Sequence, residues 1–142
     1  MNELVFKACN FAALAGWVLL IGFPRAGITR LAVFRLGVPL LLAVGYLLLL
    51  ATGLEAFRAG GGFGSLAQVQ TLFSFPRAAL AGWVHYLAFD LFVGSRIARD
   101  SQRRGISPYA VAPALLLTFL FGPVGLLTYA LQRRTGPGRT RL

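Results

Sequence analysis

Long apolar stretches, separated by short arginine-rich segments, set the pattern of the chain. A transmembrane helix needs about 20 consecutive, predominantly apolar residues. Four stretches meet that length, and they run from about Leu4 to Phe23, Leu31 to Leu54, Pro76 to Ile97 and Tyr109 to Leu131. The pattern therefore predicts an all-α membrane protein, a four-transmembrane-helix bundle, in which residues 1–132 form a single domain.

The connection between the second and third spans carries local signals of its own. Its glycine-rich segment, residues 60–64, is flexible and can approach other backbone closely. Ser65 followed by Gln68 fits a capping box, and the apolar residues after it fall on one helical face: Leu66, Val69, Leu72 and Phe73. We expect a short interfacial helix here, with an ordered loop as the alternative.

The composition indicates that lipid is the natural solvent of this chain. It is 57% hydrophobic and 13% charged, whereas a soluble domain is about 45–50% apolar and about 25% charged. A net charge of +10 is also found among nucleic-acid-binding proteins. However, the basic residues lie between apolar runs, so we expect membrane lipid as their partner and no nucleic acid.

Four spans would place both termini on one side of the membrane. Lysine and arginine would then divide evenly between the two sides, which leaves the orientation open under the positive-inside rule. Arg25, Arg30 and Arg35 follow the first span, which usually weighs most, and favour a cytoplasmic position for the two short connections. Residues 133–142 form a basic tail that we expect to be disordered.

Two ionisable residues within the third span are the most informative polar groups. His85 is the only histidine of the chain, and Asp90 is the only acid inside a predicted span. Ionisable side chains are costly in hydrocarbon and mark functional sites by default. Five positions along a helix turn the two side chains about 140° apart, so they do not form a dyad. Tyr86 shares a face with Asp90, and Phe89 shares the other face with His85.

A structural role is the alternative for these residues. Asp90 can join helices by bonding a neighbour, the candidates being Tyr86, Asn10 and Thr118. The lone His85 can be a neutral packing residue. We favour catalytic proton transfer by His85, Asp90 and Tyr86, because both ionisable groups lie on one short helix.

The fourth predicted span contains the run Phe121-Gly122-Pro123-Val124-Gly125. Proline inside a helix frees a carbonyl and kinks the helix. We expect either a pocket near the membrane midplane or a packing notch. In the first case the candidate substrate-binding residues are Asn10, Trp83, Phe89, Thr118, Gly122 and Pro123.

Metal binding is a weaker possibility for the same residues. Zinc takes three or four protein ligands. His85, Asp90 and Glu55 would supply only the smallest number of ligands. Cys9 is the only cysteine, which excludes an internal disulfide and a multi-cysteine metal site. The sequence therefore predicts no metal and no cofactor.

Two segments carry a resemblance to a known family. Residues 83–94, WVHYLAFDLFVG, followed by residues 119–127, FLFGPVGLL, resemble the abscisic-acid-deficient-four-like family. Parts of the first span and of the long connection are similar to that family as well, namely Phe6, Asn10, residues 17–20, residues 63–66 and residues 72–73. The resemblance covers nearly the whole chain, and the block of residues 85–90, HYLAFD, is its most specific part.

The resemblance implies a membrane protein linked to xanthophylls. The plant member is the neoxanthin-synthesis protein of plastids, and its reaction class converts an epoxy-xanthophyll into an allenic one. Such an isomerisation needs an acid at the epoxide oxygen and a base at a vinylic carbon–hydrogen bond, without redox change. His85, Tyr86 and Asp90 are chemically suitable, and which of them is acid or base stays open.

The chain lacks an evident plastid transit peptide and is rich in arginine, alanine and glycine. We therefore expect a protein of the bacterial inner membrane that acts on a carotenoid or a similar apolar terpenoid. The alternative is a non-enzymatic membrane subunit or a lipid- or pigment-binding module, which the small size and the basic loops favour. A homo-oligomer or a larger membrane complex is compatible with both.

Overall fold

The computed structural model describes residues 1–135, and the predicted all-α architecture is confirmed there. The helices, including one π-helix (η1), are α1 (Asn2–Gly22), α2 (Gly27–Thr29), η1 (Arg30–Phe34), α3 (Gly37–Thr52), α4 (Glu55–Arg58), α5 (Leu66–Ser74), α6 (Pro76–Arg103), α7 (Pro108–Phe121) and α8 (Pro123–Thr135). In this part of the chain, three segments are long and apolar enough to cross a membrane, and α7 is a shorter apolar helix; the three are Asn2–Gly22, Gly27–Thr52 and Pro76–Arg103.

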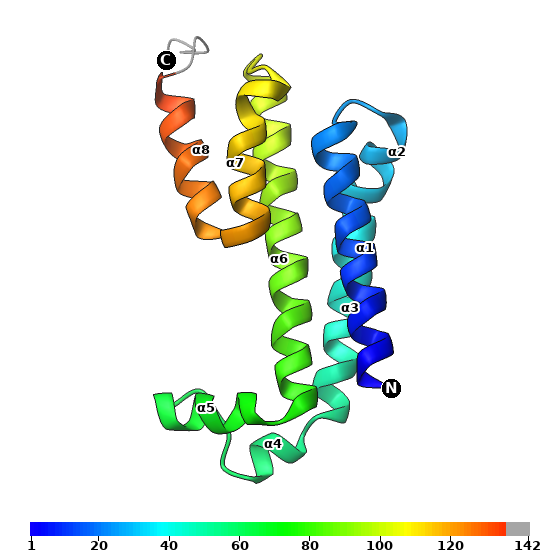
Figure 1. The fold of residues 1–142 in the computed structure, drawn as a ribbon, viewed down its shortest axis with the longest axis vertical. Helices are drawn as coiled ribbons and strands as arrows, with labels where there is room; N and C mark the ends of the chain where they lie inside the picture. The colour runs from blue at the N-terminus through cyan, green and yellow to red at the C-terminus, as the bar shows by residue number, and fades with distance from the viewer. Residues whose placement is uncertain (136–142) are drawn as a thin grey trace.

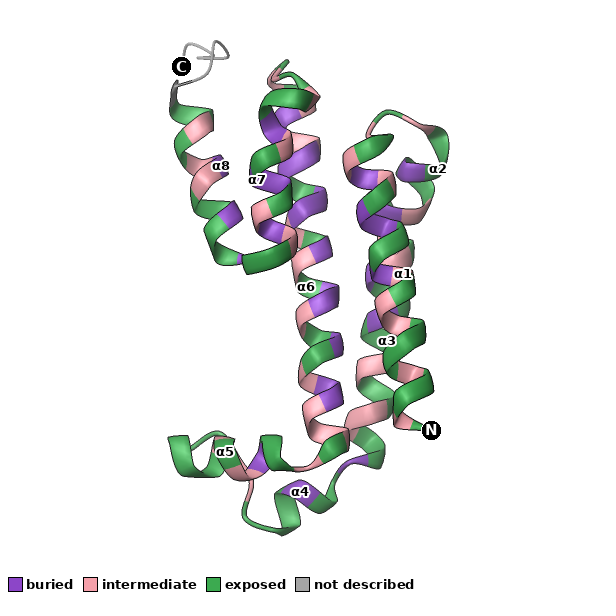
Figure 2. Cartoon of the chain, viewed as in Figure 1, coloured by how far each residue is buried: buried purple, intermediate pink, exposed green. Residues whose placement is uncertain are grey.

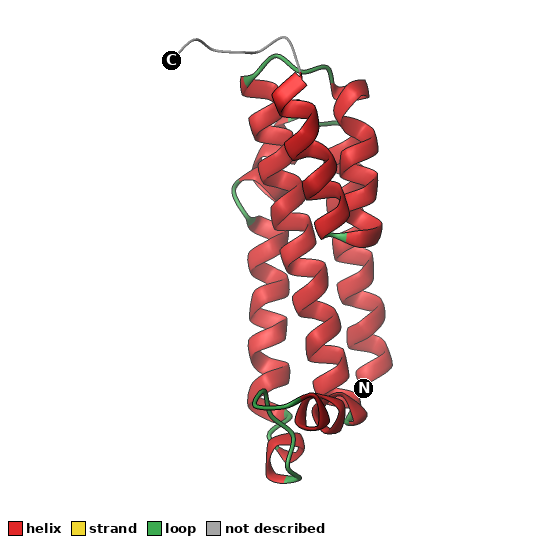
Figure 3. Cartoon of the chain, turned by 90° about the vertical axis from the view of Figure 1, so that its left-hand side faces the viewer, coloured by secondary structure: helices red, strands yellow, loops and turns green. Residues whose placement is uncertain are grey.

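The longest helix, α6, is the centre of the molecule (Figure 1). It packs against α1 and α3, and it also contacts α5, α7 and α8. The long helices run side by side in both directions of view (Figures 1 and 3). They therefore define two ends: the N-terminal end, with Met1, α4 and α5, and the arginine end, with the α1–α3 connection (residues 23–36) and the last turn of α6.

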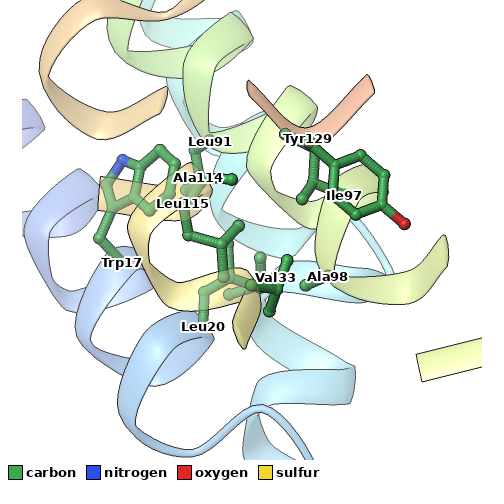
Figure 4. Close-up of a cluster of buried hydrophobic side chains, with 10 residues drawn as sticks. Trp17, Leu20, Val33, Leu91, Ile97, Ala98, Ala114, Leu115 and Tyr129 are labelled. Carbon is green, nitrogen blue, oxygen red and sulfur yellow. The ribbon is translucent and has the colours of Figure 1, made fainter. Parts of the chain in front are cut away.

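Close packing joins α1 to α6. A Cβ atom added at Gly16 would lie 2.7 Å from a methyl carbon of Leu91, and one at Gly94 would lie 2.5 Å from the Trp17 ring. Trp17 and Leu91 belong to a buried cluster to which α1, η1, α6, α7 and α8 contribute (Figure 4). Between helices in lipid, tight packing of this kind contributes more than removal of apolar surface from water.

Many residues of the long helices are exposed (Figure 2), and a large share of the exposed residues are large and apolar. The side chains of α3 are the clearest case, because several large ones are more than half exposed: Leu40, Leu41, Val44, Leu47 and Leu48. Soluble monomers rarely expose a contiguous apolar surface of this extent. The exposure pattern fits helices that are surrounded by lipid.

The helix α5 begins as the capping box predicts. The backbone N–H of Gln68 donates to Ser65 Oγ at 3.2 Å, and the backbone N–H of Gly64 donates to Gln68 Oε1 at 2.9 Å. The helix lies across the N-terminal end of α6 (Figure 1), with Leu72 buried and Leu66 exposed. The short helix between the second and third spans is therefore confirmed, and its apolar face is only partly covered by protein.

The predicted fourth span, Tyr109 to Leu131, is a helical hairpin and not one helix. From the arginine end α7 runs to the middle of α6, and α8 runs back beside it (Figure 1). The turn is at Gly122, whose φ of 37° and ψ of −89° suit glycine. Pro123 is then the first residue of α8, a position where its missing N–H costs no hydrogen bond. The chain therefore reverses direction at Gly122, where the sequence predicts only a kink within one helix.

The hairpin changes the predicted topology. Met1 and Thr135 lie at opposite ends of the long axis (Figure 1), so the prediction that both termini share one side is wrong for the described residues. The predicted tail, residues 133–142, begins within α8, and residues 136–142 lie outside the part that the structure describes.

Candidate functional site

Asp90 lies where α6 meets the turn of the hairpin. A Cβ atom at residue 122 would lie 2.6 Å from Asp90 Oδ1, so Gly122 is required by space as well as by its backbone angles. Asp90 Oδ2 is buried and has no hydrogen-bond partner among the described residues. A buried acceptor without a partner costs about 1–3 kcal/mol, and more when it is charged. Such a group calls for an explanation, and a catalytic role is one of those known for unsatisfied buried groups.

Tyr86 completes this site from one turn earlier on α6. Its hydroxyl donates to the carbonyl oxygen of Leu120 at 3.1 Å and lies 3.4 Å from that of Phe119. These carbonyls belong to the last turn of α7, where helix carbonyls lack partners within the helix. The phenol is close enough to the Asp90 carboxylate for the two groups to influence each other electrostatically, although no hydrogen bond reaches Oδ2. We call Tyr86, Asp90 and the turn at Gly122 the turn site.

His85 faces away from the turn site, as the helical spacing predicts. Its ring stacks on Phe89 with centroids 4.5 Å apart, and it contacts the Tyr46 ring of α3 at 5.3 Å. The side chain also lines a groove of about 210 Å³ whose other walls are mainly apolar. We call it the His85 groove, and besides His85 and Tyr46 its lining includes Leu49, Leu50, Phe57, Phe63, Leu72 and Phe73.

Asn10 bonds a different partner from those predicted. Its Oδ1 accepts a hydrogen bond from Trp83 Nε1 at 3.2 Å, and its Nδ2 donates to the carbonyl oxygen of Phe6 at 2.7 Å. The Trp83 ring in turn contacts the Tyr86 ring at 5.4 Å. Asn10 therefore supports the turn site indirectly, through Trp83 and Tyr86, and it is not the partner of Asp90 that the structural alternative allowed.

Thr118 is also placed differently from the prediction. It is fully buried, and its hydroxyl donates to the carbonyl oxygen of Ala114, one turn earlier in α7, at 2.7 Å. A Cβ atom at Gly125 would collide with this hydroxyl. Thr118 thus lies in the contact between α7 and α8, and it too is not the partner of Asp90 that the structural alternative allowed.

A polar network that the sequence analysis missed ties α8 to α6. Asp100 Oδ2 accepts hydrogen bonds from the Tyr129 hydroxyl at 2.7 Å and from Arg104 Nε at 2.8 Å. The hydrogen bond and the charge of Asp100 raise the pKa of the Arg104 guanidinium above its usual range. The i,i+4 spacing of Asp100 and Arg104 was a visible signal, but nothing in the sequence pointed to Tyr129.

The chemistry of the described residues is therefore divided between two places. The turn site holds a carboxylate and a phenol against the backbone carbonyls at the end of α7, which suits proton transfer. The His85 groove is apolar with one imidazole at its wall. Within residues 1–135, no group of three or more His, Cys, Asp and Glu side chains is placed to hold a metal ion.

These features define a small helical protein with apolar candidate spans and an acid held against a helical hairpin. The chain belongs to the ABA DEFICIENT 4-like family, whose sequence model matches residues 4–129. The matched region includes every predicted site residue, and it confirms the family that the sequence resemblance indicated. No curated protein and no solved structure matches the chain.

Proposed function

We propose that this protein is an acid–base isomerase of the bacterial inner membrane that acts on a carotenoid, a xanthophyll or a similar apolar terpenoid. The observation that carries the proposal is the buried, unpartnered Oδ2 of Asp90 at the hairpin turn. The resemblance of the family to the plant neoxanthin-synthesis protein supports the substrate class. The apolar spans and the apolar groove suit a substrate that is dissolved in lipid.

The proposed reaction moves one proton within the substrate. Asp90 removes the vinylic proton, the epoxide carbon–oxygen bond breaks, and the electron pair of the carbon–hydrogen bond forms the new double bond of the allene. Tyr86 donates a proton to the epoxide oxygen, and the proton on Asp90 returns to the phenolate. Substrate and product have the same formula, so no oxidant or reductant is needed. A positioned acid or base typically contributes about 10²–10⁴-fold in rate.

His85 has a different role in this proposal. Since its ring stacks on Phe89 and contacts Tyr46, away from Asp90, it does not act in the same step. We assign it to the binding of an apolar part of the substrate in the His85 groove. Phe57, Phe63 and Phe73 provide aromatic walls for a polyene chain there.

The test is pigment conversion in a carotenoid-producing bacterial host that supplies epoxy-xanthophylls and, in parallel strains, other carotenoids. The wild-type protein should yield an isomer of a supplied pigment, and Asp90→Asn should lower the yield at least about 100-fold. Glu55→Gln is the matched control, because Glu55 is an exposed acid at the N-terminal end. Identical pigment profiles for wild type and Asp90→Asn in every background would refute the proposal.

A lipid- or pigment-binding module is the second candidate function. The His85 groove favours it, because the groove is apolar and its lining does not include Asp90 or Tyr86. In that case an unconverted pigment or lipid should copurify with the protein and be lost on Leu49→Asn substitution. Retention of the pigment in Asp90→Asn, without any isomer in the wild type, would favour this second function over the first.

The hairpin also gives a basis for the membrane orientation. At the N-terminal end, the basic residues are Lys7, Arg58 and Arg77. All others that the structure describes lie at the arginine end, namely Arg25, Arg30, Arg35, Arg96, Arg99, Arg103, Arg104, Arg133 and Arg134. Under the positive-inside rule we assign the arginine end to the cytoplasm.

A further inference from the structure

A pocket at the arginine end gathers basic side chains from two separate elements. Its volume is about 580 Å³, within the range of small-ligand sites of about 300–1,000 Å³. Its basic lining consists of Arg25, Arg30 and Arg35 from the α1–α3 connection and Arg99 and Arg103 from α6. We call this the arginine pocket.

Hydrogen bonds hold the two walls of the arginine pocket in place. Arg99 Nη1 donates to the carbonyl oxygen of Phe34 at 3.2 Å, and Gln102 Nε2 donates to that of Pro24 at 2.9 Å. The buried Thr29 hydroxyl donates to the carbonyl oxygen of Phe23 at 2.6 Å and so fixes the connection to α1. The arginines converge because hydrogen bonds tie both ends of the α1–α3 connection to neighbouring helices.

The charge of the pocket is not balanced by protein groups. Among the described residues the only ion pair joins Arg104 to Asp100, outside the pocket lining. Asp100 also accepts a hydrogen bond from the Tyr129 hydroxyl, Asp90 lies against Gly122 in the turn site, and the acids Glu3 and Glu55 belong to the N-terminal end. Like charges that converge without a counter-ion repel one another. An anion bound between them would relieve that repulsion.

We propose that the arginine pocket binds the phosphate group of an anionic membrane lipid. Guanidinium groups match phosphate oxygens through paired hydrogen bonds, and basic pockets beside transmembrane helices take anionic lipid headgroups. Phe34 lines the pocket, and the neighbouring Ile28 and Leu31 are more than half exposed. Exposed apolar side chains on the same connection can contact the acyl chains of a bound lipid, which favours a lipid over a free phosphate. The proposal does not depend on the isomerase activity.

The test is a lipid titration of the purified full-length protein in a neutral detergent. Cardiolipin, phosphatidylglycerol and phosphatidylcholine are added separately, and bound lipid is counted by native mass spectrometry. One arginine near an anionic lipid is worth about fivefold in affinity, so Arg30→Gln/Arg35→Gln should bind the anionic lipids about 25-fold more weakly. Arg58→Gln/Arg134→Gln has the same net charge and should bind them like the wild type.

Two further comparisons make the outcome decisive. Arg30→Lys/Arg35→Lys keeps the charge and should lie between the wild type and the glutamine variant, because lysine lacks the planar fork. If inorganic pyrophosphate displaces the lipid at a concentration similar to that of the lipid, the pocket recognises a water-soluble phosphate and the assignment to a lipid is overturned. Equal binding of phosphatidylcholine and the anionic lipids, or equal losses in the pocket and control variants, would overturn the proposal.

Discussion

At the scale of residues, the turn site depends on a contact that only glycine permits. Gly122 combines a positive φ with a position where a Cβ atom would meet the Asp90 carboxylate. The turn therefore brings backbone directly against an acid that has an unpartnered oxygen. Any side chain at this position displaces either the acid or the turn.

We predict that Gly122→Ala destabilises the protein and abolishes pigment conversion. The unfavourable backbone angles cost about 1–3 kcal/mol, and the contact with Asp90 adds to that cost. Gly45→Ala is the control, since Gly45 lies inside α3 with nothing within 4 Å of an added Cβ atom. Thermal unfolding in detergent should show a lower Tm than the wild type for Gly122→Ala and an equal or higher Tm for Gly45→Ala. Equal Tm values for the wild type and Gly122→Ala would show that the turn does not require glycine.

Helical periodicity was enough to predict part of the site. It put Tyr86 and Asp90 on one face of the third span and His85 on another, and the structure agrees. It could not say which residues of other helices face them. Asn10 bonds Trp83, and Thr118 bonds its own helix, because the pairing of helices and their rotation are set by tertiary packing.

At the scale of elements, the hairpin of α7 and α8 is the unusual part of the fold. Its legs are in close contact at Thr118 and Gly125, and α8 is tied to α6 by the hydrogen bond that Asp100 accepts from Tyr129. Tyr129 is also a member of the main buried cluster (Figure 4). These contacts lie away from the turn site, and they hold it in position by fixing the hairpin against α6.

We predict that Tyr129→Phe loosens α8 without unfolding the protein. A hydrogen bond to a charged group is worth about 1.5–3 kcal/mol, and the ring remains to fill its place in the core. Hydrogen exchange should become faster in the amides of α8 and stay unchanged in α1. Tyr109→Phe is the control because Tyr109 is 91% exposed; an identical exchange rate in α8 for Tyr129→Phe and the wild type would show that the network does not hold the hairpin.

The elements with strong local signals were predicted, and the reversal was not. Length and hydropathy identified the first three spans, and the Ser65–Gln68 capping box identified α5. A stretch of about 23 apolar residues satisfies a single span and a folded hairpin equally well. The Gly122-Pro123 pair can mark a kink or a turn, and the choice between them depends on contacts with α6.

At the scale of the whole molecule, the hairpin decides both the site and the topology. It places the turn at Gly122 beside the middle of α6, and it returns the chain to the arginine end (Figure 1). Nearly all described arginines then share one end, whereas a fourth span would divide the basic residues evenly. The position of the turn site and the topology therefore both depend on the reversal at Gly122.

Cysteine accessibility in cells tests directly whether the chain reverses at Gly122. In a Cys9→Ala background, Ala59→Cys marks the N-terminal end, Ser107→Cys marks the arginine end, and Arg134→Cys marks the last turns of α8. A membrane-impermeant maleimide is applied to intact spheroplasts and to inverted vesicles. We predict that Arg134→Cys reacts from the same side as Ser107→Cys and that Ala59→Cys reacts from the other. If Arg134→Cys reacts from the side of Ala59→Cys, the chain crosses the membrane a fourth time and the hairpin is wrong.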